Sequence, residues 1–226
     1  MNARRSLVGQ RASEWGLRAL LLLLVVDFFV VAPIAQQGIA FAVRPVIHSI
    51  VLLSGIAIAL GSRRIVSTLV GILAMAGLVI HWTYHVQPTA ALSRVDTGLS
   101  LTFTAIITGL TLLQVFRAGS ITLYRIEGAV AVYLLAAYAW ALAYQLVDLS
   151  DPEAFSFPAT AVPQTLRFRL LYFSLTTLSS VSYGDITPLD PIARALAALE
   201  GTMGQLFPVL LLARLVSQEL YDRQRG

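Results

Sequence analysis

The 226-residue chain contains no cysteine, and charged residues of any kind make up only 12% of it. Without cysteine it can form no disulfide, no thiolate metal site and no cysteine nucleophile. Soluble domains carry about 25% charged residues, whereas 57% of this chain is apolar. This balance indicates an integral membrane protein. Lysine is also absent, so the sixteen basic residues are all arginine, a usage typical of high-GC coding that favours a bacterial source.

Patterns that carry catalysis are lacking too. The sequence shows no nucleophile paired with a base, no phosphate-binding glycine loop and no pair of catalytic carboxylates. We therefore expect no enzyme and no cofactor. The net charge of +4 comes from arginines at the edges of apolar runs rather than from a basic stripe with interleaved aromatic residues, so no nucleic-acid partner is expected.

Long apolar runs dominate the chain, and a helix needs about 20 such residues to cross a bilayer. Six segments qualify, at residues 19–36, 45–61, 65–83, 98–116, 127–148 and 190–217. The first is too long for a signal peptide and carries Asp27 in its middle, so we expect an uncleaved helix. Asp27 in lipid requires a polar partner, for which His48, Thr102 and Thr104 are candidates.

The distribution of arginine predicts the orientation, because cytoplasmic loops carry an excess of basic residues. With the N-terminus inside, the short external loops hold only Arg44, Arg94, Arg167 and Arg169. Six crossings then put both termini in the cytoplasm. We expect the membrane to be a bacterial inner membrane. The loop before the last span faces outside.

That loop contains the most informative motif, Ser180-Val181-Ser182-Tyr183-Gly184-Asp185, between a short hydroxyl-rich apolar segment and the last apolar helix. Non-helical backbone at membrane depth is tolerated only where it is buried in protein or lines a water-filled path. The stretch Leu175–Pro188 resembles the pore region of the potassium-channel family, whose run usually reads Thr-Val-Gly-Tyr-Gly-Asp with a proline two residues later. Ser180 stands for the threonine and Ser182 for the first glycine. The resemblance covers residues 165–217.

The resemblance implies an all-α integral membrane fold with six transmembrane helices, a re-entrant pore helix and a selectivity-filter loop, assembled as a homotetramer. Residues 1–120 would form a four-helix domain and residues 121–226 a pore domain. Within the pore domain we expect an outer helix at 127–148, a pore helix at 168–179, the filter at 180–185 and an inner helix at 190–217. About ten residues follow the inner helix, so we expect no soluble regulatory domain after it.

The same resemblance assigns the ion sites. The backbone carbonyls of Ser180, Val181, Ser182 and Tyr183 would replace the hydration shell of K⁺, and the Ser180 hydroxyl would close the inner end without the methyl that fixes a threonine rotamer. In the family both filter glycines have left-handed backbone. Gly184 keeps this freedom, whereas Ser182 costs about 1 kcal/mol or more per chain. Three outcomes follow: weaker discrimination of K⁺ from Na⁺, a selective filter with adapted neighbours, or a collapsed filter.

Residues around the filter take roles from their motif positions. Support for the filter is assigned to Tyr172, Phe173, Thr176, Thr177, Asp185 and Glu200. Gly204 matches the family's hinge glycine, and helical spacing puts Gln205 and Pro208 on the cavity face. Glu200 lies on the Gly204 face, which favours a protonated or hydroxyl-bonded buttress against the pore helix over a cation site in the cavity.

The four front helices lack the features of a voltage sensor or a metal site. No basic residue occurs at 97–116, whereas a voltage sensor repeats arginine along this helix, so no steep voltage dependence is expected. His81 and His85 are four residues apart, but with Asp96 as the only nearby carboxylate a zinc site is not expected. Sensing of external pH by these histidines, and binding of a lipid or apolar ligand by the front helices, stay open.

The sequence thus predicts a prokaryotic six-helix member of the potassium-channel superfamily that conducts cations passively through a lipid bilayer. Potassium is the first candidate for the permeant ion and sodium the alternative. A weakly selective or non-selective cation channel is one competing interpretation, because Ser182 replaces a filter glycine. A non-conducting scaffold or sensor that keeps the pore fold is the other.

Overall fold

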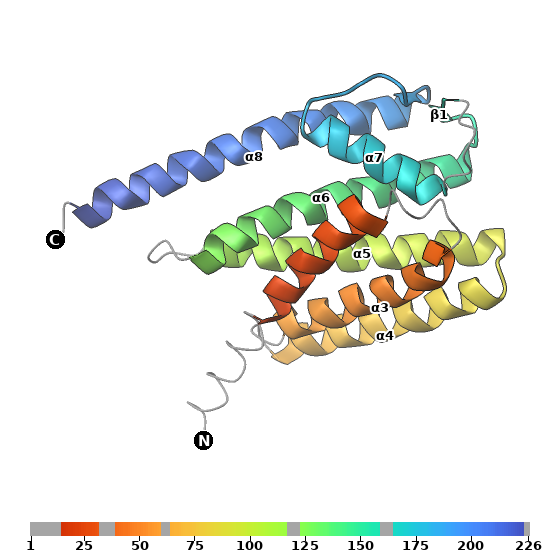
Figure 1. Ribbon diagram of the computed structural model, residues 1–226, viewed down its shortest axis with the longest axis horizontal. Helices are drawn as coiled ribbons and strands as arrows, with labels where there is room; N and C mark the ends of the chain where they lie inside the picture. The colour runs from red at the N-terminus through yellow and green to blue at the C-terminus, as the bar shows by residue number, and fades with distance from the viewer. Residues whose placement is uncertain (1–14, 32–38, 60–63, 117–122, 159–164, 224–226) are drawn as a thin grey trace.

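The computed structural model describes residues 15–31, 39–59, 64–116, 123–158 and 165–223 (Figure 1). A helix at 15–26 continues into a π-helical turn, η1 (Asp27–Val31). The elements that follow are α3 (Ile39–Ala59), α4 (Arg64–Val86), α5 (Ala90–Val115), α6 (Leu123–Ser150), β1 (Phe155–Ser156), α7 (Leu166–Leu178), β2 (Thr187–Pro188) and α8 (Pro191–Arg223).

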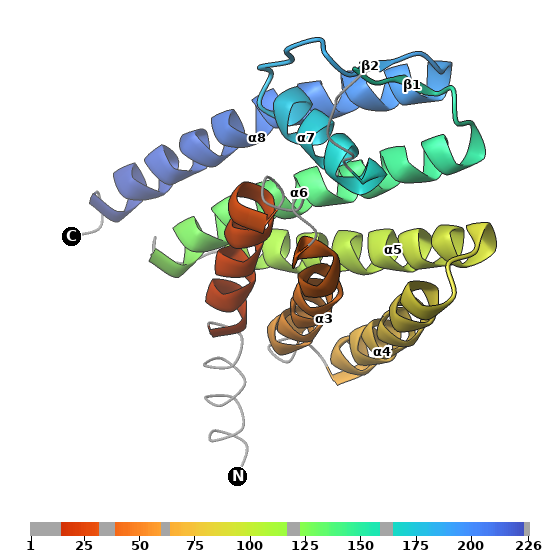
Figure 2. The same ribbon diagram turned by 45° about the vertical axis from the view of Figure 1, so that its right-hand side comes forward.

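The helices form successive layers, which both ribbon views show (Figures 1 and 2). Helices α3 and α4 pack against α5, and α5 lies along α6. On the other side of α6, the short helix α7 lies between α6 and the long helix α8. Among the described residues, regular structure is therefore all helical except for the two-residue pairing of β1 with β2, which the sequence did not predict.

Four helices among the described residues are long and apolar enough to cross a membrane: Arg64–Val86, Ala90–Val115, Leu123–Ser150 and Pro191–Arg214. Each coincides with a predicted span, although α5 begins eight residues before the predicted start at residue 98. The other two predicted spans, 19–36 and 45–61, extend into residues outside the described ranges. The six-span topology therefore stays a prediction.

Arginines that were assigned to external loops lie in helices instead, and this corrects the predicted loop boundaries. Helix α3 begins at Ile39 and includes Arg44, α5 includes Arg94, and α7 includes Arg167 and Arg169. A long arginine side chain can occupy a helix near its end because its guanidinium reaches polar groups at a distance. Arg94, for example, donates through Nη2 to the carbonyl oxygen of Leu149 at 3.0 Å.

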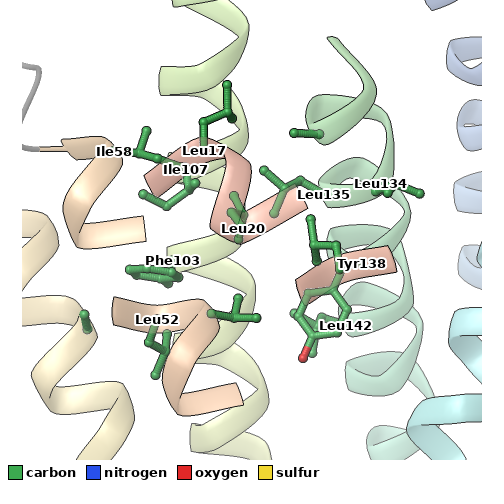
Figure 3. Close-up of a cluster of buried hydrophobic side chains, with 14 of the residues drawn as sticks. Leu17, Leu20, Leu52, Ile58, Phe103, Ile107, Leu134, Leu135, Tyr138 and Leu142 are labelled. Carbon is green, nitrogen blue, oxygen red and sulfur yellow. The ribbon is translucent and has the colours of Figure 1, made fainter. Parts of the chain in front are cut away.

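One hydrophobic core joins the front helices to the outer helix α6, across the predicted domain boundary at residue 120 (Figure 3). Phe103 of α5 packs so closely on α3 that a Cβ on Gly55 would lie 2.5 Å from its ring. The buried residues labelled in Figure 3 come from the first helix, α3, α5 and α6: Leu17, Leu20, Leu52, Ile58, Phe103, Ile107, Leu134, Leu135, Tyr138 and Leu142.

The segment before α7 is joined to the segment that precedes α8. β1 and β2 pair antiparallel, with Phe155 opposite Pro188, and the Ala154 carbonyl accepts a hydrogen bond from the Leu189 N–H at 2.8 Å. Asp190 then caps α8, because its Oδ1 accepts from the N–H of Ile192 at 2.8 Å. These contacts fix where the chain enters the inner helix.

Candidate functional site

The candidate site begins with α7, which is too short to cross a bilayer. Its 13 residues span about 20 Å, whereas a hydrocarbon core is about 30 Å thick. The helix ends at Leu178 with Ser179 as its C-cap, so the chain must turn back. The segment Ser180–Asp185 is the non-helical return, followed by β2 and α8. This arrangement is the one predicted from the motif, with α7 running from 166 to 178 rather than from 168 to 179.

Backbone hydrogen bonds tie the start of the return segment to the last turns of α7. The carbonyl oxygen of Thr176 accepts from the N–H groups of Val181 at 2.9 Å and Ser182 at 3.1 Å. The Thr177 carbonyl accepts from the Ser180 N–H at 3.0 Å. Thr176 and Thr177 therefore contact the segment through main-chain oxygens, while the Thr176 hydroxyl donates back to its own helix.

The backbone of the return segment alternates in hand. Ser180, Ser182 and Gly184 have φ angles of +58°, +39° and +79°, and these are the residues with positive φ among the described part of the chain. Residues with positive φ therefore alternate with residues that have negative φ along this segment. Ser182 therefore has the left-handed backbone expected at its position, which costs a residue with a Cβ about 1–2 kcal/mol. The same conformation at Ser180 was not predicted.

All six residues from Ser180 to Asp185 are exposed in the single chain. Val181 is 51% exposed and Tyr183 is 72% exposed. Non-helical backbone at membrane depth must be buried in protein or line a water-filled path, so the exposure of this segment is the unusual feature. Behind the segment lies a cavity of about 260 Å³, whose walls include Ser182, Thr177 and Ala197. A hydroxymethyl group at Ser182 therefore has space on this side.

The aromatic residues of α7 divide between two environments. The ring of Tyr172 stacks parallel to that of Tyr183, with centroids 6.4 Å apart, and its hydroxyl lies on the side of the Asp185 carboxylate. Phe173 belongs to a buried cluster, edge-on to Tyr144 at 5.1 Å and Phe155 at 5.6 Å, and also lines the cavity behind the return segment.

Glu200 is fully buried in α8 and lies against α7. Its Oε1 is 2.5 Å from the Ser174 hydroxyl, and its Oε2 accepts from the Tyr144 hydroxyl at 2.5 Å. The Ser174 hydroxyl also contacts the Ala137 carbonyl at 2.7 Å, an oxygen that can only accept. One serine proton cannot serve both bonds, so both are satisfied when Glu200 carries a proton and donates it to Ser174. This position against α7 is the expected one, and its supporting role stays a prediction.

Helix α8 touches the end of α7 one turn further along, at Gly204. A Cβ at Gly204 would lie 1.9 Å from the Leu178 carbonyl oxygen, so only glycine fits where these backbones cross. The same oxygen accepts from the Tyr133 hydroxyl at 3.1 Å. The structure therefore gives Gly204 a packing reason for being glycine, in addition to the hinge role that its motif position predicts.

Gln205, the next residue, turns toward the inner end of the return segment. Its Nε2 donates to the Ser180 hydroxyl at 2.7 Å. Both side chains are exposed in the single chain, as is Pro208, which lies within α8. The direct contact between Gln205 and Ser180 was not predicted, although both residues were candidates.

A second polar group was missed by sequence reasoning. Arg167, in the first turn of α7, donates to Asp96 Oδ2 at 3.2 Å and to Gln145 Oε1 at 2.9 Å. Asp96 is 2% exposed, and its Oδ1 lies 3.1 Å from His81 Nδ1. Asp96 lies two residues before the span predicted at 98–116, so the sequence did not mark it as buried. Because α5 begins at Ala90, the residue lies within the helix and requires a polar partner.

The other polar residues of the front helices do not extend this group into a metal site. His85 packs edge-on to Trp82 with centroids 6.0 Å apart. Among the residues that the structure describes, no three histidine or acidic side chains come together in a way that could hold a metal ion. Asp27 begins η1, and the side chain of His48, one of its predicted partners, lies outside the described part.

A comparison with protein families bears on the pore half of the chain. Residues 129–219 match a family model described as "Ion channel", a range that includes most of α6, α7, the return segment and most of α8. No curated protein and no solved structure matches the chain. The matched region and the apolar helices together indicate a multi-pass membrane protein with an ion-channel domain.

Proposed function

We propose that the protein is a passive cation channel of the potassium-channel type, in which Ser180–Gly184 form the selectivity filter. The observation that carries this proposal is the alternation of positive φ at Ser180, Ser182 and Gly184. Such a backbone can aim successive carbonyl oxygens at one line, and rings of carbonyl oxygens are what replaces the hydration shell of K⁺ in a filter.

Assembly as a homotetramer follows from this proposal, because one strand supplies only one side of each ion site. The exposure of the segment Ser180–Asp185 supports assembly, since non-helical backbone at membrane depth must be buried in protein or line a water-filled path, and neighbouring subunits would provide both. The inner helix presents further exposed apolar side chains for the same purpose: Ile192, Leu199, Met203, Leu206, Val209 and Leu210. With a parallel arrangement of four chains, α8 of each would line the cavity below the filter.

The permeant ion depends on how Ser182 is tolerated. Its left-handed backbone, with φ of +39°, lies in the region that glycine enters without cost. The cavity behind the filter gives its side chain room, which supports a filter that keeps its shape and selects potassium. The strain, repeated in four chains, supports the second candidate, a channel that separates K⁺ from Na⁺ less sharply.

Gln205 would complete the innermost site. Serine lacks the methyl that restricts the rotamer of threonine, so the Ser180 hydroxyl would be free to turn. Its hydrogen bond with Gln205 at 2.7 Å would hold the hydroxyl in place instead. Gln205 would thus substitute for the missing methyl.

The proposed channel responds little to voltage. Among the basic residues of the sequence, Arg94 is the one within α5 (Ala90–Val115), and it bonds a carbonyl of α6. Moving charge through the membrane supplies the energy of voltage gating, and α5 has no ladder of arginines to move. We further propose that both termini are cytoplasmic and that the filter faces outside, as the arginine distribution indicates.

The test is the bi-ionic reversal potential of the purified protein in planar bilayers, with K⁺ on one side and Na⁺ on the other. A reversal potential close to the potassium equilibrium value is expected for a filter whose surroundings hold Ser182. A value near zero would establish the weakly selective channel. Absence of flux in protein that is folded and assembled would contradict channel function and would favour a non-conducting scaffold.

A further inference from the structure

The first turn of the pore helix is held by one residue of the front helices and by one residue of the outer helix α6. Arg167 reaches Asp96 of α5 through Nη2 at 3.2 Å and Gln145 of α6 through Nε at 2.9 Å. Asp96 also contacts His81 of α4 at 3.1 Å. We call His81, Asp96, Gln145 and Arg167 the Asp96–Arg167 cluster. It joins four helices at the end of the molecule where α7 begins (Figure 2).

The position of Arg167 is electrostatically unfavourable for α7 by itself. The N-terminal end of a helix carries partial positive charge, and a cation in the first turn is therefore unfavourable there. The Asp96 carboxylate, 2% exposed, supplies the opposite charge beside it. Since a buried charge needs a partner, Asp96 and Arg167 each require the other. The beginning of the pore helix is consequently attached to the front helices.

The other end of α7 is attached to the inner helix. Its last residue, Leu178, lies directly under Gly204, and the filter starts two residues later at Ser180. A pore helix held at both ends transmits a displacement at one end to the other, because packed helices move as rigid bodies rather than deform. A shift of α5 would therefore move Ser180 through α7.

We infer that Asp96 is a positioning residue for the filter, acting through Arg167, and that the front four helices influence conduction by this contact. This inference rests on the proposed channel function. It gives the front helices a role that does not need gating arginines, since their position rather than their charge would reach the filter. The coupling would act at the outer part of the pore, beside the filter.

The experiment compares Asp96→Asn, Arg167→Gln and the double variant with wild-type channels in single-channel recordings. Each single variant removes one member of the Asp96–Arg167 ion pair and is expected to change unitary conductance or the K⁺/Na⁺ permeability ratio about threefold or more. The double variant removes both members of the pair and should lie closer to wild type than either single variant. A purely structural role would lower the number of channels and leave both quantities unchanged, which would overturn the inference.

A matched control is available in the same chain. Arg18 and Glu127 form an ion pair at 3.0 Å that also joins a front helix to α6, but at a point about 27 Å along α6 from Gln145. Glu127→Gln should leave unitary conductance and permeability ratio at wild-type values. If it changes them as much as Asp96→Asn does, the effect is general loosening, and the inference is overturned.

Two further outcomes are decisive. If the single variants do not accumulate, Arg167→Lys replaces them, because it keeps the charge beside Asp96 but puts a single nitrogen in place of the planar fork that reaches Asp96 through Nη2 and Gln145 through Nε. Wild-type unitary conductance and permeability ratio in Arg167→Lys would then overturn the inference. Conducting wild-type protein with unchanged variants refutes the positioning role alone, whereas wild-type protein without flux refutes the channel function as well.

Discussion

Gly204→Ala should damage the protein at the crossing of the inner helix and the pore helix. A Cβ at residue 204 would lie 1.9 Å from the Leu178 carbonyl oxygen and 2.7 Å from its carbonyl carbon. Ordinary contacts begin at 3.4 Å, so one helix must move by about 1.5 Å to restore van der Waals distance. The atoms in the way are backbone, so no change of rotamer relieves the clash.

Gly201, one turn earlier on the same helix, provides the control. A Cβ at residue 201 would meet only the Thr177 carbonyl oxygen at 3.8 Å, an ordinary contact. Alanine gains about 1 kcal/mol of helix propensity over glycine at either position. At Gly204 this gain is opposed by overpacking, which costs about 1–3 kcal/mol, and more where backbone must shift. We therefore expect Gly201→Ala to melt at or above the wild-type temperature and Gly204→Ala to melt below it.

The assay is thermal unfolding of the purified variants in one detergent, followed by single-channel recording of those that assemble. Because the Leu178 carbonyl lies two residues before Ser180, Gly204→Ala channels should also show altered unitary conductance. If Gly204→Ala has the stability and conductance of Gly201→Ala, then the helices do not cross as closely as described and the reasoning fails.

Three other substitutions test the filter and its support. Ser182→Gly should raise the stability of each chain by about 1 kcal/mol by relieving left-handed strain and should increase the K⁺/Na⁺ permeability ratio; a lower ratio in reversal-potential measurements would show that the serine side chain is needed. Glu200→Ala should cost about 1–3 kcal/mol because it leaves the buried Tyr144 hydroxyl without its acceptor, while Ser174 keeps its bond to the Ala137 carbonyl. Glu200→Gln should keep the contacts to Tyr144 and Ser174 and melt near the wild-type temperature in thermal unfolding; equal losses in the two variants would contradict the buttress. Gln205→Met should lower unitary conductance by freeing the Ser180 hydroxyl, and adding Ser180→Thr should restore it; a double variant as impaired as Gln205→Met would mean that Gln205 acts otherwise.

The short helix, return segment and inner helix were predictable because each has a local signal. The sequence changes from a short apolar segment to a polar run and then to a long apolar segment, and these correspond to the 13-residue helix, the return segment and the inner helix. The left-handed backbone at Ser182 followed from the motif. That at Ser180 could also have been found, by extending the two-residue period from Gly184 and Ser182 one step back.

Contacts between distant segments were not predictable in the same way. Arg167 meets Asp96 across 71 positions in sequence, and no periodicity links the two residues. The pairing of β1 with β2 involves two residues on each side, which is too short to show alternation. Such features depend on how helices pack in three dimensions. The sequence did not mark Asp96 as buried, so its need for a partner was not predictable either.

Arg167, rather than the shared core, limits how far this pore can be separated from the rest of the chain. Apolar faces of α6 that now touch front helices would be solvated equally well by lipid chains if those helices were removed. A guanidinium group finds no such substitute in hydrocarbon. A pore isolated as residues 123–226 would therefore need a neutral residue at position 167 before it became self-sufficient. A pore domain that folds without the front helices would therefore differ from the natural pore domain at residue 167.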